Sequence, residues 1–136
     1  MSRREEREQA FALLFERLVN QNSVEEVIEN AGLARDCDVT DSIRTIAYGV
    51  EQTEEELNHI IEENLSASWK RSRLSKVTMA LLQLAIYELK YMEDIPLKVS
   101  INECVELAKL YGGEDDASFL NGVLGSVAKK TEQSND

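Results

Sequence analysis

Three arginines near the beginning of the chain, Arg3, Arg4 and Arg7, have the chemistry and spacing to bind phosphate. In a helix predicted over residues 3–20 they project from one side, and the glutamates between them project from the other. Ion pairs within the helix explain such charges, each worth a few tenths of a kcal/mol. Cations are, however, unfavourable at a helix N-terminus, where the dipole favours anions. The pattern therefore leaves two interpretations open, a solvated helix end and a phosphate-binding surface.

A second basic cluster stands in the middle of a strongly acidic chain. No acidic residue occurs from Asn64 to Tyr87, and this segment holds Lys70, Arg71, Arg73 and Lys76. Trp69 adjoins the cluster, either to cap the core or to offer a stacking surface. The net charge of −11 argues against broad affinity for nucleic acid, which depends on neutralising phosphates. Any nucleic-acid site must be a local patch or be completed by a basic partner.

Residues that could support catalysis or metal binding are not grouped in this sequence. His59 is the only histidine and has no further ligand at metal spacing. Cys37 and Cys104 lie far apart, as is typical of reduced thiols inside the cell. We therefore predict that the protein is not an enzyme and has no catalytic residues, metal or cofactor. The charged N-terminus is no signal peptide, and no apolar run approaches the roughly 18 residues of a membrane span. These features predict a cytoplasmic protein without a membrane partner.

Apolar residues at helical spacing predict an all-α fold of one domain over residues 1–130, with a polar tail over 131–136. Helices are predicted over residues 3–20, 23–31, 41–64, 74–92, 97–111 and from 114 onwards. The helix over 74–92 is nearly apolar and should be buried at the centre. Between Val77 and Leu89 its only polar residues are Thr78, Gln83 and Glu88. One narrow stripe is left for water or a partner, formed by Ser72, Lys76, Gln83 and Lys90.

Three segments resemble the NusB family of bacterial transcription antitermination factors. They are Arg3-Arg4-x-x-Arg7-Glu8, Trp69-Lys-x-x-Arg73-Leu-Ser-Lys-Val77 with Leu84-Ala-x-Tyr-Glu-Leu89, and the run from Asp94 to Leu124. The last contains Asp-Ile-Pro-Leu-Lys-Val-Ser-Ile-Asn-Glu and ends in Phe119-Leu-Asn-Gly-Val-Leu124. The resemblance covers nearly the whole chain and is weakest over residues 22–60.

This resemblance implies about seven helices in two packed sub-bundles around the central helix. It also implies a non-enzymatic protein that binds boxA RNA of nascent ribosomal transcripts jointly with NusE, a ribosomal small-subunit protein. The complex would join RNA polymerase and suppress premature termination. The family contains monomers and homodimers, so the oligomeric state stays open.

Residues of the family's two binding surfaces have counterparts in this chain. Its RNA-binding positions correspond to Arg3, Arg4, Arg7, Lys98, Asp115 and Phe119, of which Phe119 could stack on a base or pack in the core. Its NusE-facing positions correspond to Phe15, Ser72, Thr78, Met79 and Gln83. Three of these depart from the family pattern. Thr78 stands where an acid is usual, Met79 where a basic residue is usual and Gln83 where arginine is frequent.

These departures and the acidic net charge keep a second interpretation open. The chain would then be a helical protein-interaction adaptor of the transcription machinery with weak or no direct RNA binding. A third interpretation, an accessory module of an RNA methyltransferase, would need a catalytic domain that these 136 residues do not contain. RNA binding measured with and without NusE separates the first two.

Overall fold

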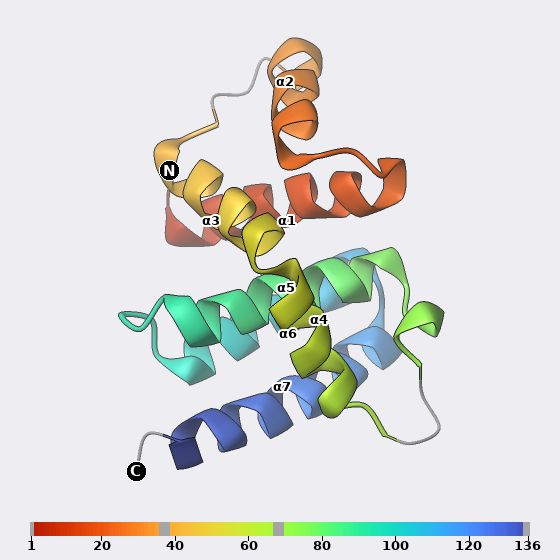
Figure 1. The fold of residues 1–136 in the computed structure, drawn as a ribbon, viewed down its shortest axis with the longest axis vertical. Coiled ribbons are helices and arrows are strands. Elements are labelled where there is room, and N and C mark those ends of the chain that lie inside the picture. Colours follow the sequence, from red (N-terminus) through yellow and green to blue (C-terminus); the bar gives the residue numbers. More distant parts are fainter. Residues whose placement is uncertain (1, 36–38, 67–69, 135–136) are drawn as a thin grey trace.

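The computed structural model describes residues 2–35, 39–66 and 70–134, which form seven α-helices, one short 3-10 helix and no strand. Figure 1 shows these helices in two groups, with the first three above the last four. The first sub-bundle contains α1 (Arg3–Asn20), α2 (Val24–Arg35) and α3 (Asp41–Gln52). The second contains α4 (Glu54–Glu63), η1 (Arg71–Arg73), α5 (Lys76–Tyr91), α6 (Leu97–Tyr111) and α7 (Glu114–Ser134). The predicted all-α fold is confirmed.

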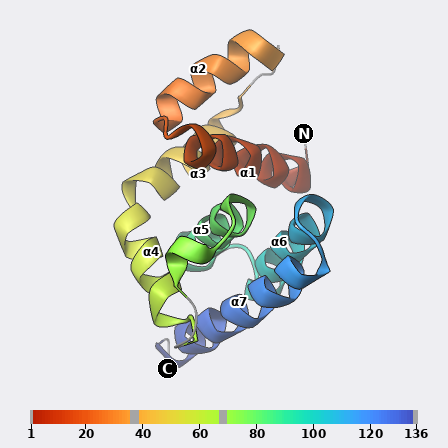
Figure 2. The ribbon, with the colours of Figure 1, turned by 90° about the vertical axis from the view of Figure 1, so that its right-hand side faces the viewer.

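Helix α5 is the central element, as its apolar sequence predicts. Ser75 begins it, because its Oγ accepts a hydrogen bond of 3.1 Å from the Thr78 backbone N–H. Helices α1, α4, α6 and α7 surround it in the view of Figure 2, and α3 also packs against it. Every residue from Thr78 to Leu89 is buried except the partly buried Tyr87. This helix therefore joins the two sub-bundles.

The exposed stripe predicted along α5 is wrong at its middle position. Lys76 and Lys90 are exposed at the two ends of the helix, but Gln83 has no surface open to water. Its Nε2 donates a hydrogen bond of 3.0 Å to Oδ1 of Asn58 on α4. The sequence pattern did not reveal that α4 would cover this side of α5.

The single helix predicted over residues 41–64 is two helices that meet at Thr53. The Thr53 hydroxyl donates a 2.7 Å hydrogen bond to the Gly49 carbonyl, a side-chain contact that bends helices. Gly49 lies against the ring of Tyr87, and a Cβ there would stand 2.3 Å from the tyrosine hydroxyl oxygen. The chain thus turns from one sub-bundle to the other just after Gly49 packs against α5.

Two helices continue further than predicted. Gly32 does not end α2, which runs to Arg35. A glycine costs a helix about 1 kcal/mol, which packing of Val24, Val27 and Ile28 against the core offsets. The tail predicted from residue 131 is likewise helical through Ser134, where α7 buries Val127 and Ala128 in its preceding turn.

The described residues can also be examined for membrane-spanning helices, metal sites and reactive side chains. No helix among them is long and apolar enough to cross a membrane. Within the same residues, no group of histidine, cysteine and acidic side chains could hold a metal ion. His59 is exposed and pairs with Glu63. Cys104 is buried, and burial raises the pKa of its thiol far above the usual range. Cys37 and Trp69 lie outside the described residues.

Candidate nucleic-acid and partner surfaces

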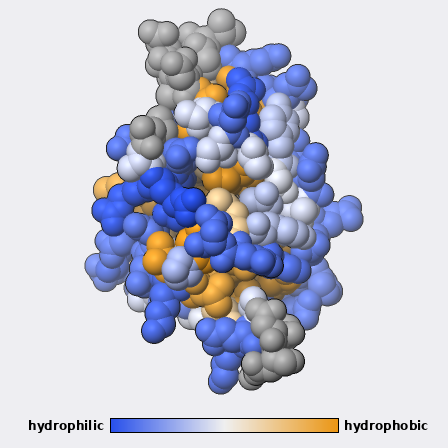
Figure 3. Space-filling model, turned by 90° about the vertical axis from the view of Figure 1, so that its left-hand side faces the viewer, coloured by the Kyte–Doolittle hydropathy of each residue, from blue (hydrophilic) through white to orange (hydrophobic). Residues whose placement is uncertain are grey.

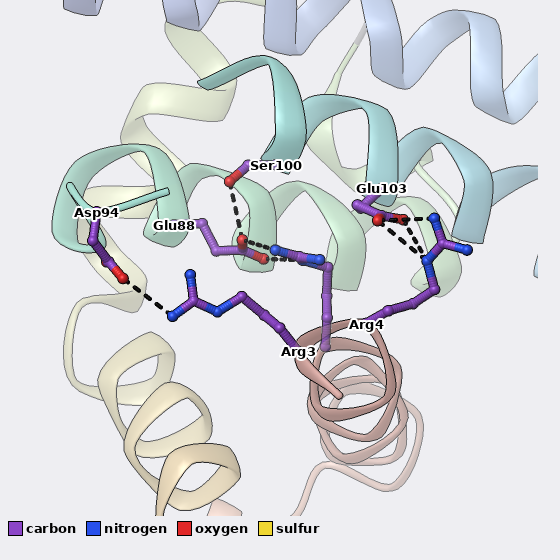
Figure 4. A network of polar contacts seen from close by, with 7 residues as sticks. Arg3, Arg4, Glu88, Asp94, Ser100 and Glu103 are labelled. Atoms are coloured by element: carbon purple, nitrogen blue, oxygen red, sulfur yellow. Dashed lines mark hydrogen bonds and ion pairs between the residues drawn. The ribbon is translucent and has the colours of Figure 1, made fainter. Parts of the chain in front are cut away.

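Two of the three N-terminal arginines are exposed, and each contacts a carboxylate of the second sub-bundle. Ser2 caps α1 by accepting a 3.1 Å hydrogen bond from the Glu5 backbone N–H. Arg3 Nη2 donates to Asp94 Oδ2 at 3.1 Å, and Arg4 donates through Nε and Nη2 to Glu103 at 3.0–3.2 Å. Figure 4 shows both side chains reaching from α1 towards α6 and the turn before it. The first turn of α1 therefore presents two cations whose guanidinium groups are paired but open to water.

Arg7 is different, and the prediction that it lies exposed beside Arg3 and Arg4 is wrong. Only 4% of Arg7 is exposed. Its Nη2 and Nε donate to the two carboxylate oxygens of Glu88 at 2.7 and 2.8 Å, and Ser100 Oγ donates to the same carboxylate at 3.0 Å. Burial opposes the charge most strongly, but the hydrogen bonds to Glu88 and the attraction of nearby negative charges together outweigh it and leave the pKa of Arg7 raised. Arg7 thus links α1 to α5 and α6, and its guanidinium is not available to a ligand.

The remaining predicted RNA-binding residues lie along α6 and α7. Lys98 is exposed in the first turn of α6, and Asp115 is exposed in the first turn of α7. Phe119 is partly buried and packs against the core, so it has the edge position that its spacing indicates. Tyr111 is an exposed aromatic residue at the opposite end of α6 from Lys98, and its role is not apparent from the sequence pattern. Its ring packs 5.2 Å from that of Phe11, and its hydroxyl donates to Glu8 at 2.8 Å.

The predicted partner-facing residues are only partly brought together. Met79 and Gln83 line a pocket of about 230 Å³. The rest of its lining consists of Leu18, Glu54, Asn58, Arg71, Leu74 and Lys76. Thr78 is buried and turns to α7, where its Oγ1 lies 3.3 Å from Asp116 Oδ1. Phe15 packs against Phe11 at 6.0 Å between ring centroids. The backbone of Ser72 lies in η1, while its side chain is outside the described part.

A polar network at this pocket is incomplete. Arg17 Nη1 donates to Glu54 Oε2 at 2.7 Å, which lowers the pKa of that carboxyl. Gln83 Nε2 also points to Glu54, at 3.4 Å. The Oε1 atom of Gln83 is buried and accepts no hydrogen bond from the described residues. A buried acceptor without a donor costs about 1–3 kcal/mol, so a hydrogen-bond donor that reaches this oxygen through the pocket would bind favourably.

A larger hollow of about 790 Å³ contains none of the predicted site residues. It lies between the ends of α4, α5 and α7 and the beginning of α6, with Ile60, Leu89, Ile95 and Val127 in its lining. The face in Figure 3 shows apolar surface in its lower half, divided by hydrophilic side chains.

Comparison with known proteins gives one consistent result. The NusB family model matches residues 4–129. The transcription antitermination protein NusB of Clostridium novyi is 41% identical over 133 residues, which cover 95% of this chain and 99% of that protein. The protein of the same name from Listeria monocytogenes is 41% identical over 128 residues, covering 94% and 97% of the two chains.

Solved structures have the same fold. T. maritima NusB superposes with a TM-score of 0.85 at 32% identity, covering 95% of this chain and 92% of that one. A structure of the antitermination factors NusB and NusE in complex with dsRNA superposes with a TM-score of 0.81, covering 96% and 99%. At 24% identity the second likeness supports the fold alone.

The motifs at both ends of the chain, the helical architecture and the relatives agree over nearly the full length. The family is one of non-enzymatic antitermination factors. The chain belongs to the NusB family.

Proposed function

We propose that the protein is a transcription antitermination factor that binds boxA RNA of nascent ribosomal transcripts together with NusE. The observation that carries this proposal is the NusB family match over residues 4–129. In this role it would join the RNA polymerase antitermination complex and suppress premature termination. Such a role belongs to the cytoplasm, where bacterial transcription takes place.

The proposed RNA surface is the first turn of α1 with the adjoining parts of α6 and α7. Arg3, Arg4 and Lys98 are exposed cations that could contact phosphates. Phe119 lies at the edge of the core, where part of its ring could stack on an unpaired base. Asp115 lies one turn before Phe119 and could accept hydrogen bonds from a base edge. Arg7 supports the surface from beneath by holding α1 against α5 and α6.

The proposed NusE surface is the pocket between α1, α4 and α5. Leu18, Leu74 and Met79 give it apolar walls, and the buried oxygen of Gln83 has no donor among the described side chains and backbone. A partner side chain with an apolar stem and an N–H tip would satisfy both features. A solved complex that contains a NusB and a NusE supports this partner. Thr78 is buried against α7 and would support the surface rather than touch the partner. Phe15 is partly buried, so part of its ring could still contact NusE.

The function is tested by titrating labelled boxA RNA with the protein, alone and with purified NusE. Replacing both Arg3 and Arg4 by alanine should weaken binding and reduce the slope of log K against log salt by up to about 0.7 per lost phosphate contact. Arg44→Ala with Lys129→Ala is the matched control, because it removes two exposed cations from other helices. Failure of RNA binding with and without NusE would contradict the proposal.

The NusE surface is tested separately with a charge reversal at the pocket rim. Lys76 is exposed in the first turn of α5, so Lys76→Glu should leave the fold intact and weaken NusE capture. Lys129→Glu makes the same change on α7 and should leave NusE capture unchanged. Equal capture of NusE by both variants would show that NusE binds elsewhere.

One observation favours the adaptor function as the second candidate. Both exposed N-terminal arginines are paired with carboxylates, in a chain of net charge −11. If the protein is an adaptor, it should bind NusE, and adding NusE should not increase its binding to RNA. Whether the active form is a monomer or a homodimer is answered by the mass of the protein in solution.

A further inference from the structure

The carboxylates that face Arg3 and Arg4 accept hydrogen bonds from the same guanidinium N–H groups that would bind RNA phosphates. Arg4 offers Glu103 its Nε and Nη2 atoms, the donors that a guanidinium uses for two-pronged phosphate binding. Arg3 pairs with Asp94 through a single nitrogen. These contacts join the first turn of α1 to residues more than 90 positions away in the chain.

The three arginine pairs differ in how easily they can open. The Arg7–Glu88 pair is closed to water, with 5% and 2% of the side chains exposed. Arg4 is 74% exposed, and its partner Glu103 is 20% exposed. Arg3 and Asp94 are both more than half exposed. Exposed ion pairs are weak and screened by salt, so a phosphate could displace the carboxylates of the two outer pairs but not that of the inner one.

Displacement of these carboxylates opposes RNA binding in two ways. The arginine must first lose its present partner, and the released carboxylate then lies near the incoming phosphate. Like charges at that separation repel. An RNA that contacts the protein only through its phosphates would gain little from this exchange. An RNA whose bases also stack on the protein or form hydrogen bonds with it would still bind.

We propose that Glu103 and Asp94 compete with RNA phosphates for Arg4 and Arg3 and thereby limit binding to RNA that makes additional contacts. This inference rests on the proposed RNA-binding function. Glu103 should have a larger effect than Asp94, because it accepts hydrogen bonds from two nitrogens of Arg4 and its own side chain is mostly buried. The two acids are specificity-determining residues that reduce affinity.

The test measures binding of labelled single-stranded boxA RNA to Glu103→Gln over a range of salt. Affinity should rise about two- to fivefold, the ratio that corresponds to loss of an exposed ion pair. The salt slope should steepen by up to about 0.7, since Arg4 then exchanges a counterion and not a carboxylate for the phosphate. An RNA of the same length with scrambled sequence should gain more than the boxA RNA.

Glu106→Gln is the matched control, because it removes one negative charge one turn further along α6. Glu106 pairs with Lys109 and with neither arginine. It should change affinity less than Glu103→Gln does. In an Arg4→Ala background the gain from Glu103→Gln should disappear, because its effect acts through Arg4.

Asp94→Asn, measured with and without Arg3→Ala, provides an independent test, and both side chains are exposed, so these changes should leave the fold intact. If the wild type binds RNA, two outcomes would overturn the inference but leave the proposed function intact. One is an equal gain in affinity from Glu103→Gln and Glu106→Gln, and the other is a gain from Glu103→Gln that persists in the Arg4→Ala background. If neither the wild type nor Glu103→Gln binds RNA with NusE present, the proposed function and this inference both fail.

Discussion

Helix α1 contacts the second sub-bundle through an arginine near each end, and the two contacts are built differently. At the Arg7 end, the carboxylate of Glu88 receives two hydrogen bonds from the arginine and one from Ser100, all out of contact with water. At the Arg17 end, Glu54 is about one-third exposed. There the neighbouring Oε1 atom of Gln83 is buried and accepts no hydrogen bond from the part of the chain that the structure describes.

This difference separates a contact that serves the fold from one that is left open for a partner. A buried ion pair with its hydrogen bonds satisfied gains nothing from a further ligand. A buried acceptor without a donor, next to a pocket, gains a hydrogen bond when a donor arrives. We therefore expect changes at the Arg7 end to affect stability and changes at the Arg17 end to affect partner binding.

The largest effect should come from breaking the Arg7 end. Arg7→Ala leaves Glu88 as a buried charge without its cation and should lower the free energy of unfolding by about 3–5 kcal/mol. Urea denaturation followed by circular dichroism measures this. The double variant Arg7→Met, Glu88→Leu should recover most of the loss, because it removes both charges. Two equally unstable variants would show that the ion pair is not the cause.

A contact between α3 and α5 should give an intermediate effect. Gly49→Ala places a methyl group within 2.7 Å of two ring carbons and the hydroxyl oxygen of Tyr87, so the tyrosine side chain or α3 must move. We expect a loss of about 1–3 kcal/mol in unfolding free energy, as for other overpacked sites. In a Tyr87→Leu background the same change should cost less. A Gly49→Ala variant of wild-type stability would mean that the sub-bundles adjust easily here.

At the Arg17 end, Gln83→Leu should change stability by less than about 1 kcal/mol, because it removes a buried acceptor that already lacks a donor. Asn58 and Glu54 lose one donor but stay partly open to water. Glu88→Leu is the comparison on the same helix, since it strands Arg7. A similar loss in both variants would contradict the proposed difference between the ends.

The smallest effect concerns acid. Arg17 lowers the pKa of Glu54 from its usual value of 4.5, so the pair stabilises the fold fully above that pH. This contribution disappears as the pH falls through the lower folded pKa. The difference in unfolding free energy between wild type and Arg17→Met should therefore shrink below pH 4.5. A constant difference down to the acid transition would show that packing of the Arg17 stem causes the loss.

Much of this architecture could be predicted because burial leaves a periodic trace in the sequence. The apolar run of α5 indicated a central helix, and the start of α1 and both bounds of α6 agree with prediction. The interruption at Thr53 was missed, since a hydroxyl contact to Gly49 leaves the apolar spacing unbroken.

The site was harder to predict, because spacing gives the side of a helix but not what lies opposite. Arg3, Arg4 and Arg7 share one side of α1, and only the position of α5 and α6 distinguishes the buried Arg7 from the others. The usable signal was the set of three polar residues in the apolar run of α5. Each is now buried with a partner from another helix: Thr78 with Asp116, Gln83 with Asn58, and Glu88 with Arg7.

The central claim is that NusE binds at the Arg17 end while the Arg7 end stays closed. It can be tested by following the Nε–Hε NMR signals of Arg7 and Arg17, with the Gln83 carboxamide signals, as NusE is added without RNA. The account predicts that the Arg17 and Gln83 signals shift and that the Arg7 signal keeps its position and its slow exchange with water. A shift of the Arg7 signal, with Arg17 and Gln83 unchanged, would contradict it.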